Sequence, residues 1–343
     1  MSMAAAPFHR CRGLLVVEHP TKGNFVVEFN LDRLFSGEPD QEFPPILNLP
    51  DPVAKFNSVQ PTENMAITDS GNLIVAATSL SRTLLYDASS RSASTGPDML
   101  SGKIDILLVP VADGTFFAMS FYPHLDDTPH AELLASNTDD AGGRLAWHPI
   151  PDPPLSSIPR FKRQWHISGY FVAGTRVWIS FLDEGTFSFD TACRRWRREG
   201  TWKLPVTGRA LLIPDFLGSG QQLLFGFFSR DHHFCTCDIE ARPPVIIKSW
   251  PEAIPSRLVW CARYFIEAHT AALAYYGAGR FCISTVITTG YSPQKPINMD
   301  EVLNLPRRAV SIVTVEVTPG MQLIKRKLEC YSMPAEAHVG EVI

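Results

Sequence analysis

Short apolar runs separated by glycine and acidic residues recur along the chain at intervals of about 50 residues. The clearest group lies in residues 168–202, where two gaps at Gly174 and Gly185 divide three apolar runs, and a polar turn then leads to Trp196. Glycine reaches positive φ without a Cβ clash, so these gaps suit hairpin turns. Four short antiparallel strands in about 35 residues are typical of one blade of a β-propeller.

Similar groups before and after this stretch give the chain a measurable period. The third run of each group ends at one of five positions, Asp87, Ser136, Asp190, Asp238 and Thr285. Tryptophans in the expected outer strands show the same spacing, at Trp147, Trp196 and Trp250. The repeat is degenerate, and its period of about 50 residues is its strongest signal.

Each end of the chain adds a hairpin. The N-terminal hairpin turns at Gly23, and the C-terminal one joins Ala309–Thr318 to Gln322–Tyr331. A propeller has to close its ring without leaving a long free edge. We therefore expect Gln322–Tyr331 to share a blade with the N-terminal hairpin, and Ala309–Thr318 to complete the fifth group. This gives six blades, or seven if the terminal hairpins form separate blades.

The sequence thus predicts an all-β chain folded as one β-propeller domain over residues 12–332, with flexible tails at 1–11 and 333–343. No window of 12 or more residues has a convincing helical period. Two insertions interrupt the ring. Leu31–Gln60 is a polar, proline-rich crossing, and Gly290–Arg308 contains a short helix that we expect to begin at Asn298.

Composition limits the classes of function. Hydrophobic residues make up 45% of the chain and charged residues 19%, so a large core is expected. The net charge is -4, which gives no electrostatic basis for binding nucleic acid. The seven cysteines are scattered, and no apolar run is long enough to span a bilayer. We expect a monomeric cytoplasmic or nuclear protein that does not bind membranes.

The most metal-like stretch is His233, Cys235 and Cys237, which alternate and would share one strand face. Aligned with the group at 168–202, however, the two cysteines replace Phe187 and Phe189 on the apolar face between blades. Free cysteine behaves there as a small hydrophobic residue, so we favour the core interpretation. The sequence predicts no bound metal and no cofactor.

Other candidate chemistry is weaker. The basic run Arg194–Arg198 could bind acidic partners or phosphates, but a solvated turn with arginine stems flanking a packed tryptophan is the favoured interpretation. Two acidic pairs, Asp126-Asp127 and Asp139-Asp140, lie in polar loops without calcium-loop spacing. The motifs of a nucleophile elbow, a phosphate-binding loop and a zinc protease are absent from the sequence. We assign no catalytic residue.

The pattern at 168–202, continuing to Gly208, resembles the kelch repeat and is similar to a large group of uncharacterised kelch-like proteins of plants, cereals especially. Twelve residues carry this resemblance: Gly185, Thr186, Ser188, Phe189, Asp190, Thr191, Trp196, Gly200, Trp202, Leu204, Pro205 and Gly208. It implies a propeller that displays loops to a protein partner, so we expect a non-enzymatic interaction scaffold. The alternative is an enzyme or specifier-type kelch protein with a small molecule or metal in the central channel.

Overall fold

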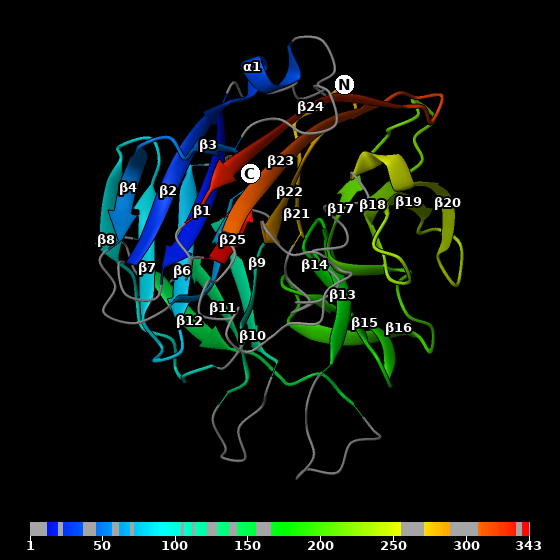
Figure 1. Ribbon diagram of the computed structural model, residues 1–343. Coiled ribbons are helices and arrows are strands. Elements are labelled where there is room, and N and C mark those ends of the chain that lie inside the picture. Colours follow the sequence, from blue (N-terminus) through cyan, green and yellow to red (C-terminus); the bar gives the residue numbers. More distant parts are fainter. Residues whose placement is uncertain are drawn as a thin grey trace, which may run out of the picture.

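The computed structural model describes residues 12–19, 23–36, 46–56, 62–68, 72–103, 106–111, 114–121, 129–136, 143–155, 166–254, 271–288, 308–333 and 338–342. As predicted, this part of the chain is almost entirely β-structure, arranged in several sheets (Figure 1). Its helical elements are the five-residue helix α1 (Leu31–Phe35) and the 3-10 turn η2 (Pro251–Ala253). None of the described helices is long and apolar enough to cross a membrane.

Three sheets have four strands each. The first has the order β25 (His338–Val342), β1 (Arg12–His19), β2 (Gly23–Asn30), β4 (Pro52–Phe56). The second contains β5 (Thr62–Ile67), β6 (Leu73–Thr78), β7 (Thr83–Asp87) and β8 (Ser92–Thr95). The third contains β9 (Ile106–Pro110), β10 (Phe116–Ser120), β11 (Ala131–Ser136) and β12 (Leu145–Pro149).

The eight-stranded sheet consists of two four-stranded halves. One half contains β13 (Ile167–Ala173), β14 (Arg176–Phe181), β15 (Gly185–Asp190) and β16 (Arg195–Gly200). The other contains β17 (Val206–Ile213), β18 (Leu223–Phe228), β19 (Phe234–Asp238) and β20 (Val245–Trp250). The first strands of the two halves pair in parallel, Gly169 with Gly208 and Tyr170 with Arg209. Gly169 allows this close approach, because a Cβ there would lie 2.3 Å from the Val206 carbonyl oxygen.

The remaining sheet has five strands. It contains β21 (Ala271–Tyr275), β22 (Arg280–Thr288), β23 (Arg308–Val317) and β24 (Leu323–Ser332), and β3 (Ile46–Asn48) adds in parallel to the outer edge of β24. The described strands therefore form six four-stranded units, which we name by their strands: β25–β4, β5–β8, β9–β12, β13–β16, β17–β20 and β21–β24.

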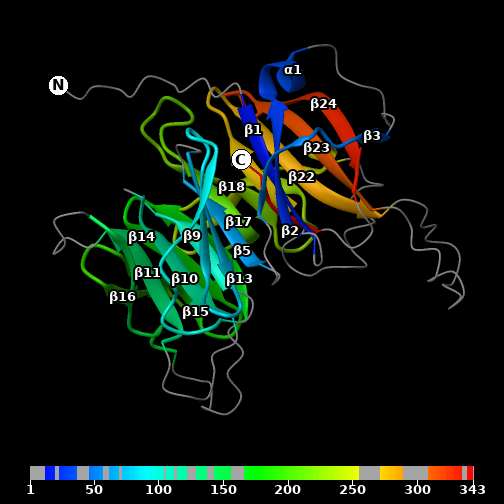
Figure 2. The same cartoon turned by 90° about the vertical axis from the view of Figure 1, so that its left-hand side faces the viewer.

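Each pair of successive units shares an apolar cluster, as expected for sheets with two covered faces. For example, Val16 and Met65 join β25–β4 to β5–β8, and Phe117 and Phe187 join β9–β12 to β13–β16. Comparable clusters lie between β5–β8 and β9–β12, between β13–β16 and β17–β20, between β17–β20 and β21–β24, and between β21–β24 and β25–β4. Figure 2 shows these sheets side by side from a second direction.

The C-terminal strands pair differently from our prediction. The N-terminal hairpin does share a sheet with a C-terminal strand, but this strand is β25, in which Val339 pairs with Val17. Gln322–Tyr331 instead forms most of β24, which pairs with β23 from Ala309–Ser332 to Val317–Leu323. A hairpin joined by a short turn gains these backbone hydrogen bonds locally, so β24 stays with its chain neighbour. The expected tail at 333–343 accordingly contains a strand.

The crossing expected at Leu31–Gln60 also has structure of its own, because it contains α1, β3 and β4. Asn30 begins the helix, since its side chain accepts a 3.0 Å hydrogen bond from Arg33 N. The helix expected at Asn298 lies outside the described residues, as does the tail at 1–11.

The periodic aspartates have a common structural role. Asp87, Asp190 and Asp238 each end the third strand of a unit, and the Oδ1 atom of each accepts hydrogen bonds from backbone N–H groups two and three residues ahead. Aspartate is favoured at such turns because its short side chain satisfies backbone donors that the strand leaves free. At these three positions the repeat in the sequence is a repeat of one turn. The prediction for Thr285 was wrong, because it lies within β22, the second strand of its unit, and not at the end of a third strand.

Candidate functional site

A fully buried ion pair anchors the connection between β8 and β9. The Lys103 ammonium contacts a carboxylate oxygen of Glu132, and both side chains have 0% exposed surface. Lys103 Nζ also donates hydrogen bonds to the Ser101 hydroxyl at 3.1 Å and to the Pro129 carbonyl oxygen at 3.2 Å. The other carboxylate oxygen of Glu132 accepts a 2.8 Å hydrogen bond from the backbone N–H of Leu100. The pair thus fixes this connection against the start of β11.

Burial dominates the electrostatics of the pair. Loss of hydration lowers the pKa of Lys103, although the carboxylate of Glu132 acts in the opposite direction. A lysine with a lowered pKa can act as a base in an enzyme, but a substrate would have to reach it. Since Lys103 is completely covered and its ammonium is hydrogen-bonded, we interpret the pair as a support for the loop.

A second polar contact lies beside this pair. His130 Nδ1 is 2.9 Å from Asp152 Oδ2, and the histidine side chain is 9% exposed whereas the aspartate is 41% exposed. The contact joins the start of β11 to the segment that follows β12. The segment that enters this unit before β9 and the segment that leaves it after β12 are therefore both attached to the start of β11.

Exposed leucines lie on the connection that the ion pair fixes and on two further connections. Leu80, between β6 and β7, is 61% exposed, and Leu100, between β8 and β9, is 54% exposed. The two connections touch, because Met99 N donates a 2.7 Å hydrogen bond to the Ser81 carbonyl oxygen. Leu182, in the equivalent β14–β15 connection, is 45% exposed. We call the ends of the units with these connections the loop side.

The distribution of exposed apolar side chains singles out the loop side. The other large hydrophobic residues found exposed in the described part of the chain all lie within the outer strands β3, β20 and β24, at Ile46, Leu47, Val245, Ile247 and Ile324. The three leucines of the loop side, two on connections within a unit and one on a connection between units, are therefore the best candidate for a binding surface in this fold.

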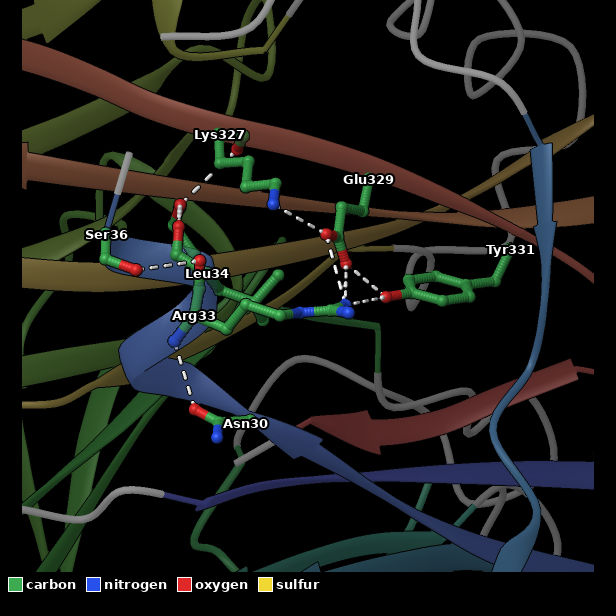
Figure 3. A network of polar contacts seen from close by, with 8 residues as sticks. Asn30, Arg33, Leu34, Ser36, Lys327, Glu329 and Tyr331 are labelled. Carbon is green, nitrogen blue, oxygen red and sulfur yellow. Dashed lines mark hydrogen bonds and ion pairs between the residues drawn. The ribbon is translucent and has the colours of Figure 1, made fainter. Parts of the chain in front are cut away.

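A second polar network docks α1 onto β24 (Figure 3). Arg33 Nη2 donates to both carboxylate oxygens of Glu329, at 3.2 and 3.0 Å. Lys327 Nζ lies 3.0 Å from the same carboxylate, and the Tyr331 hydroxyl donates a hydrogen bond to it. The carboxylate is nearly buried, with 6% exposure, whereas the Arg33 side chain is 60% exposed.

The hydrogen bonds of this network decide its charge state. Burial alone would raise the pKa of Glu329, but the hydrogen bonds from Tyr331 and Lys327 and the charge of Arg33 outweigh it, so the pKa is lowered. Burial and the same carboxylate raise the pKa of Tyr331. The group is a closed network of one acid with its donors, and we interpret it as the clamp that holds α1.

The cysteine pair occupies the core, as the alignment predicted. Cys235 and Cys237 are fully buried in the cluster between β13–β16 and β17–β20, and the hydrogen-bonding contact with Cys237, together with burial, raises the pKa of Cys235. His233 lies outside this cluster, half-buried, with Nδ1 3.1 Å from Asp231 Oδ2. Within the described ranges, no three histidine, cysteine or acidic side chains are grouped so that they could hold a metal ion.

The tryptophan of the basic run is packed as we expected, but Arg195–Arg198 belong to a strand and only Arg194 lies in a turn. Arg195, Arg197 and Arg198 are exposed on β16, while Trp196 packs inward and its Nε1 donates a 2.7 Å hydrogen bond to the Pro151 carbonyl oxygen. The acidic pairs Asp126-Asp127 and Asp139-Asp140 lie outside the described residues.

The residues around Trp202 that carry the resemblance to kelch-like proteins have a structural role. A Cβ on Gly200 would lie 2.1 Å from the Trp202 indole nitrogen, so only glycine leaves room for this ring. Thr186 Oγ1 donates a 2.8 Å hydrogen bond to the Trp202 carbonyl oxygen, and Ser180 Oγ accepts one of 2.8 Å from Leu204 N. These residues fix the crossing from β16 to β17.

Arg242 packs on the aromatic rings beside the same crossing. The guanidinium carbon of Arg242 lies 5.5 Å from the ring centre of Trp178 and 5.7 Å from that of Trp202, within the range of cation–π attraction. Phe171 stacks on Trp178 with ring centres 5.3 Å apart. Four motif residues, Thr186, Gly200, Trp202 and Leu204, therefore contribute to the junction between these two units.

Sequence reasoning missed the Lys103–Glu132 pair. The available signal was a single acidic residue inside the apolar run of β11, which normally excludes an unpaired charge. Its partner lies 29 residues earlier in an irregular segment, and no local spacing indicates that distance.

Comparisons with known proteins show the family of this chain and two solved structures to which it is similar. No curated protein matches the chain. Among solved structures, it is similar to a Saccharomyces cerevisiae complex of a Dbp5 variant bound to Nup159, a Gle1 variant, IP6 and ADP, with 10% identity, a TM-score of 0.34, and 79% of this chain and 60% of that chain covered. It is also similar to Kuenenia stuttgartiensis hydrazine synthase, with 9% identity, a TM-score of 0.38, and 77% of this chain and 65% of that chain covered.

The chain thus spans less than two thirds of the length of either of these chains. A family model described as "Protein of unknown function (DUF1668)" matches residues 12–331, which include all of the described strands except β25 and the last residue of β24. The chain therefore belongs to the DUF1668 family.

Proposed function

We propose that this protein is a non-enzymatic interaction scaffold, in which six blades close into a kelch-like β-propeller and the loop side binds a protein partner. The ring is supported by the six apolar clusters, each of which joins one unit to the next and the last unit to the first. Pairing of β25 with β1 unites the two ends of the chain in one blade.

The observation that carries the proposed function is the exposure of leucine on supported connections. Leu80 and Leu100 expose 61% and 54% of their surface, although a buried ion pair holds the second of their connections in place. Exposed apolar side chains on an ordered surface favour association with another protein, since burying them there costs little ordering entropy.

Paired variants of the full chain test this proposal. In Leu80→Asp/Leu100→Asp, two charges replace the exposed leucines of the loop side. The matched control Val245→Asp/Ile247→Asp makes the same change on β20, where the residues are 54% and 44% exposed. Cross-linking and quantitative mass spectrometry in the native tissue should recover partners with the wild type and the control, but not with the loop variant. If all three proteins recover the same partners, the loop side is not the binding surface.

A further inference from the structure

The outer strands β16 and β24 carry more charge than the other outer strands, and β24, with Lys325, Arg326, Lys327 and Glu329, already accepts β3 along Cys330–Ser332. Over Arg195–Gly200, β16 carries three arginines and one glutamate, and Arg194 precedes it in the turn. The outer strands β4, β8, β12 and β20 contain at most one charged residue each, lysine in β4 and β20. Charge protects an outer edge from aggregation, but these four strands show that the fold does not require several arginines for this purpose.

The arginines of β16 are available to a partner. Arg197 is 69% exposed, and its acidic neighbour Glu199 lies 3.7 Å away with a side chain only 5% exposed. Glu199 also accepts a 2.6 Å hydrogen bond from the Ser188 hydroxyl, so its carboxylate is directed toward β15 and not toward solvent. Arg198 donates to the carbonyl oxygen of Glu184, a neutral group, at 3.0 Å. The surface of β16 therefore presents positive charge on a protein whose net charge is -4.

The strand that carries these arginines is firmly held. Trp196 packs against Phe189 and Phe117, with ring centres 5.1 and 6.2 Å apart, and β16 pairs with β15 from Asp190–Arg195 to Thr186–Gly200. Arg195 and Arg197 are two residues apart and project on the same face of the strand. A fixed backbone reduces the entropy cost of binding a ligand along it.

The outer edge of β16 also offers backbone hydrogen-bonding groups. Among the described strands, β16 is the last in its sheet (Figure 1). The same fold shows that an outer strand can accept another strand, because β3 pairs in parallel with β24 through Cys330–Ile46 and Ser332–Asn48. β16 combines such an edge with three exposed arginines.

We propose that β16 binds an acidic protein segment in an extended conformation, which adds to the sheet as a further strand. The edge supplies main-chain hydrogen bonds, and Arg195 and Arg197 pair with alternate acidic side chains of the segment. A nucleic acid would satisfy the arginines alone, whereas an extended polypeptide also satisfies the backbone edge. This surface is distinct from the loop side, so the two proposals can fail independently.

Fluorescence anisotropy with the purified full chain tests the proposal. The probe is a labelled peptide of alternating glutamate and valine, about seven residues long, which places its carboxylates on one face of a strand. It should bind at low salt and weaken as salt is raised, because exposed charge pairs are screened. Arg195→Glu/Arg197→Glu should weaken binding by about tenfold or more. Melting of this variant should stay close to wild type, since both side chains are exposed.

Three controls establish which groups of the strand and of the peptide are responsible for binding. Lys248→Glu reverses a charge on β20, the corresponding outer strand of the next unit, and should leave binding unchanged. A peptide with glutamine in place of glutamate, and one with alternate backbone nitrogens methylated, should each bind more weakly, because they lack the charges or the strand hydrogen bonds. The proposal is overturned if the peptide does not bind, if the arginine variant binds it equally well, if the methylated peptide keeps full affinity, or if an oligothymidylate competes at equal charge.

Discussion

Trp147 Nε1 in β12 donates a 2.9 Å hydrogen bond to Thr83 Oγ1 in β7, 64 residues earlier in the chain. The same N–H also lies 3.1 Å from the Pro97 carbonyl oxygen. Trp196 and Trp250 make comparable bonds to carbonyl oxygens of neighbouring units, at Pro151 and Met321. The tryptophans spaced about 50 residues apart are thus joints between successive units of the repeat.

Loss of the Trp147 joint should destabilise the domain. Trp147→Phe keeps most of the apolar contact but removes the indole N–H, and we expect a loss of about 1–2 kcal/mol in the free energy of unfolding. Urea unfolding followed by circular dichroism measures it. Thr83→Val removes only one of the two acceptors and should cost less. An effect of Thr83→Val as large as that of Trp147→Phe would contradict a joint shared between Thr83 and Pro97.

The buried ion pair should behave as a coupled unit. Lys103→Met leaves the Glu132 carboxylate buried without its cation, so we expect a loss of about 3–5 kcal/mol in the free energy of unfolding. Lys103→Met/Glu132→Leu removes both charges and should lose less than Lys103→Met alone. Urea unfolding of the two single variants and the double variant measures the coupling. Additive losses would show that the two side chains do not depend on each other.

Gly185 should resist substitution for reasons of backbone geometry. Its φ is +96°, and a Cβ there would lie 2.3 Å from the Gly200 carbonyl oxygen. We expect Gly185→Ala to destabilise the protein by about 1–3 kcal/mol, or more if the outer strand has to shift. Gly174→Ala is the matched control, since Gly174 has φ +58° with no neighbouring atom within 4 Å. The melting temperature of Gly185→Ala should be well below that of Gly174→Ala. Equal melting temperatures would contradict the clash.

Removal of β25 should affect the whole domain. β25 pairs with β1 and lies beside β5, β21 and β22, so deleting Pro334–Ile343 removes contacts with two other units, β5–β8 and β21–β24. We expect tryptophan fluorescence, which reports on distant units, to show melting at a lower temperature than in the wild type. Val339→Pro should act in the same direction by interrupting the ladder without shortening the chain. Unchanged melting in both variants would argue against a ring closed by β25.

The strands themselves were largely readable from the sequence, because alternating apolar residues and turn glycines are local signals. Asp190 and Asp238 marked the period correctly since each completes a turn within three residues. Which C-terminal strand pairs with the N-terminal hairpin could not be predicted from such local signals. β25 is short, contains Gly340 and carries little apolar character, whereas β24 looks like a suitable partner for any hairpin. Pairing partners distant in the chain, such as Lys103 and Glu132, leave no local pattern.

The turn aspartates should make stability depend on pH. The side-chain and backbone hydrogen bonds from Ser89 lower the pKa of Asp87 from 3.8 to about 2. Although burial acts against it, hydrogen bonds from Ala192 and Cys193 and the contact with Arg176 also lower the pKa of Asp190. A carboxyl group with a lower pKa in the folded state stabilises the fold above its unfolded pKa, and this contribution is lost as pH falls through the folded value.

We therefore expect the urea midpoint to fall between about pH 4 and pH 2 for the wild type, and to fall less for Asp87→Asn/Asp190→Asn. The variant should be less stable than the wild type above this window and should approach it at the acidic end, because protonated aspartate no longer favours the turn. Asp183→Asn, in an exposed connection, serves as the control and should follow the wild-type curve. Parallel curves for the wild type and the double variant would mean that other carboxyl groups govern acid unfolding.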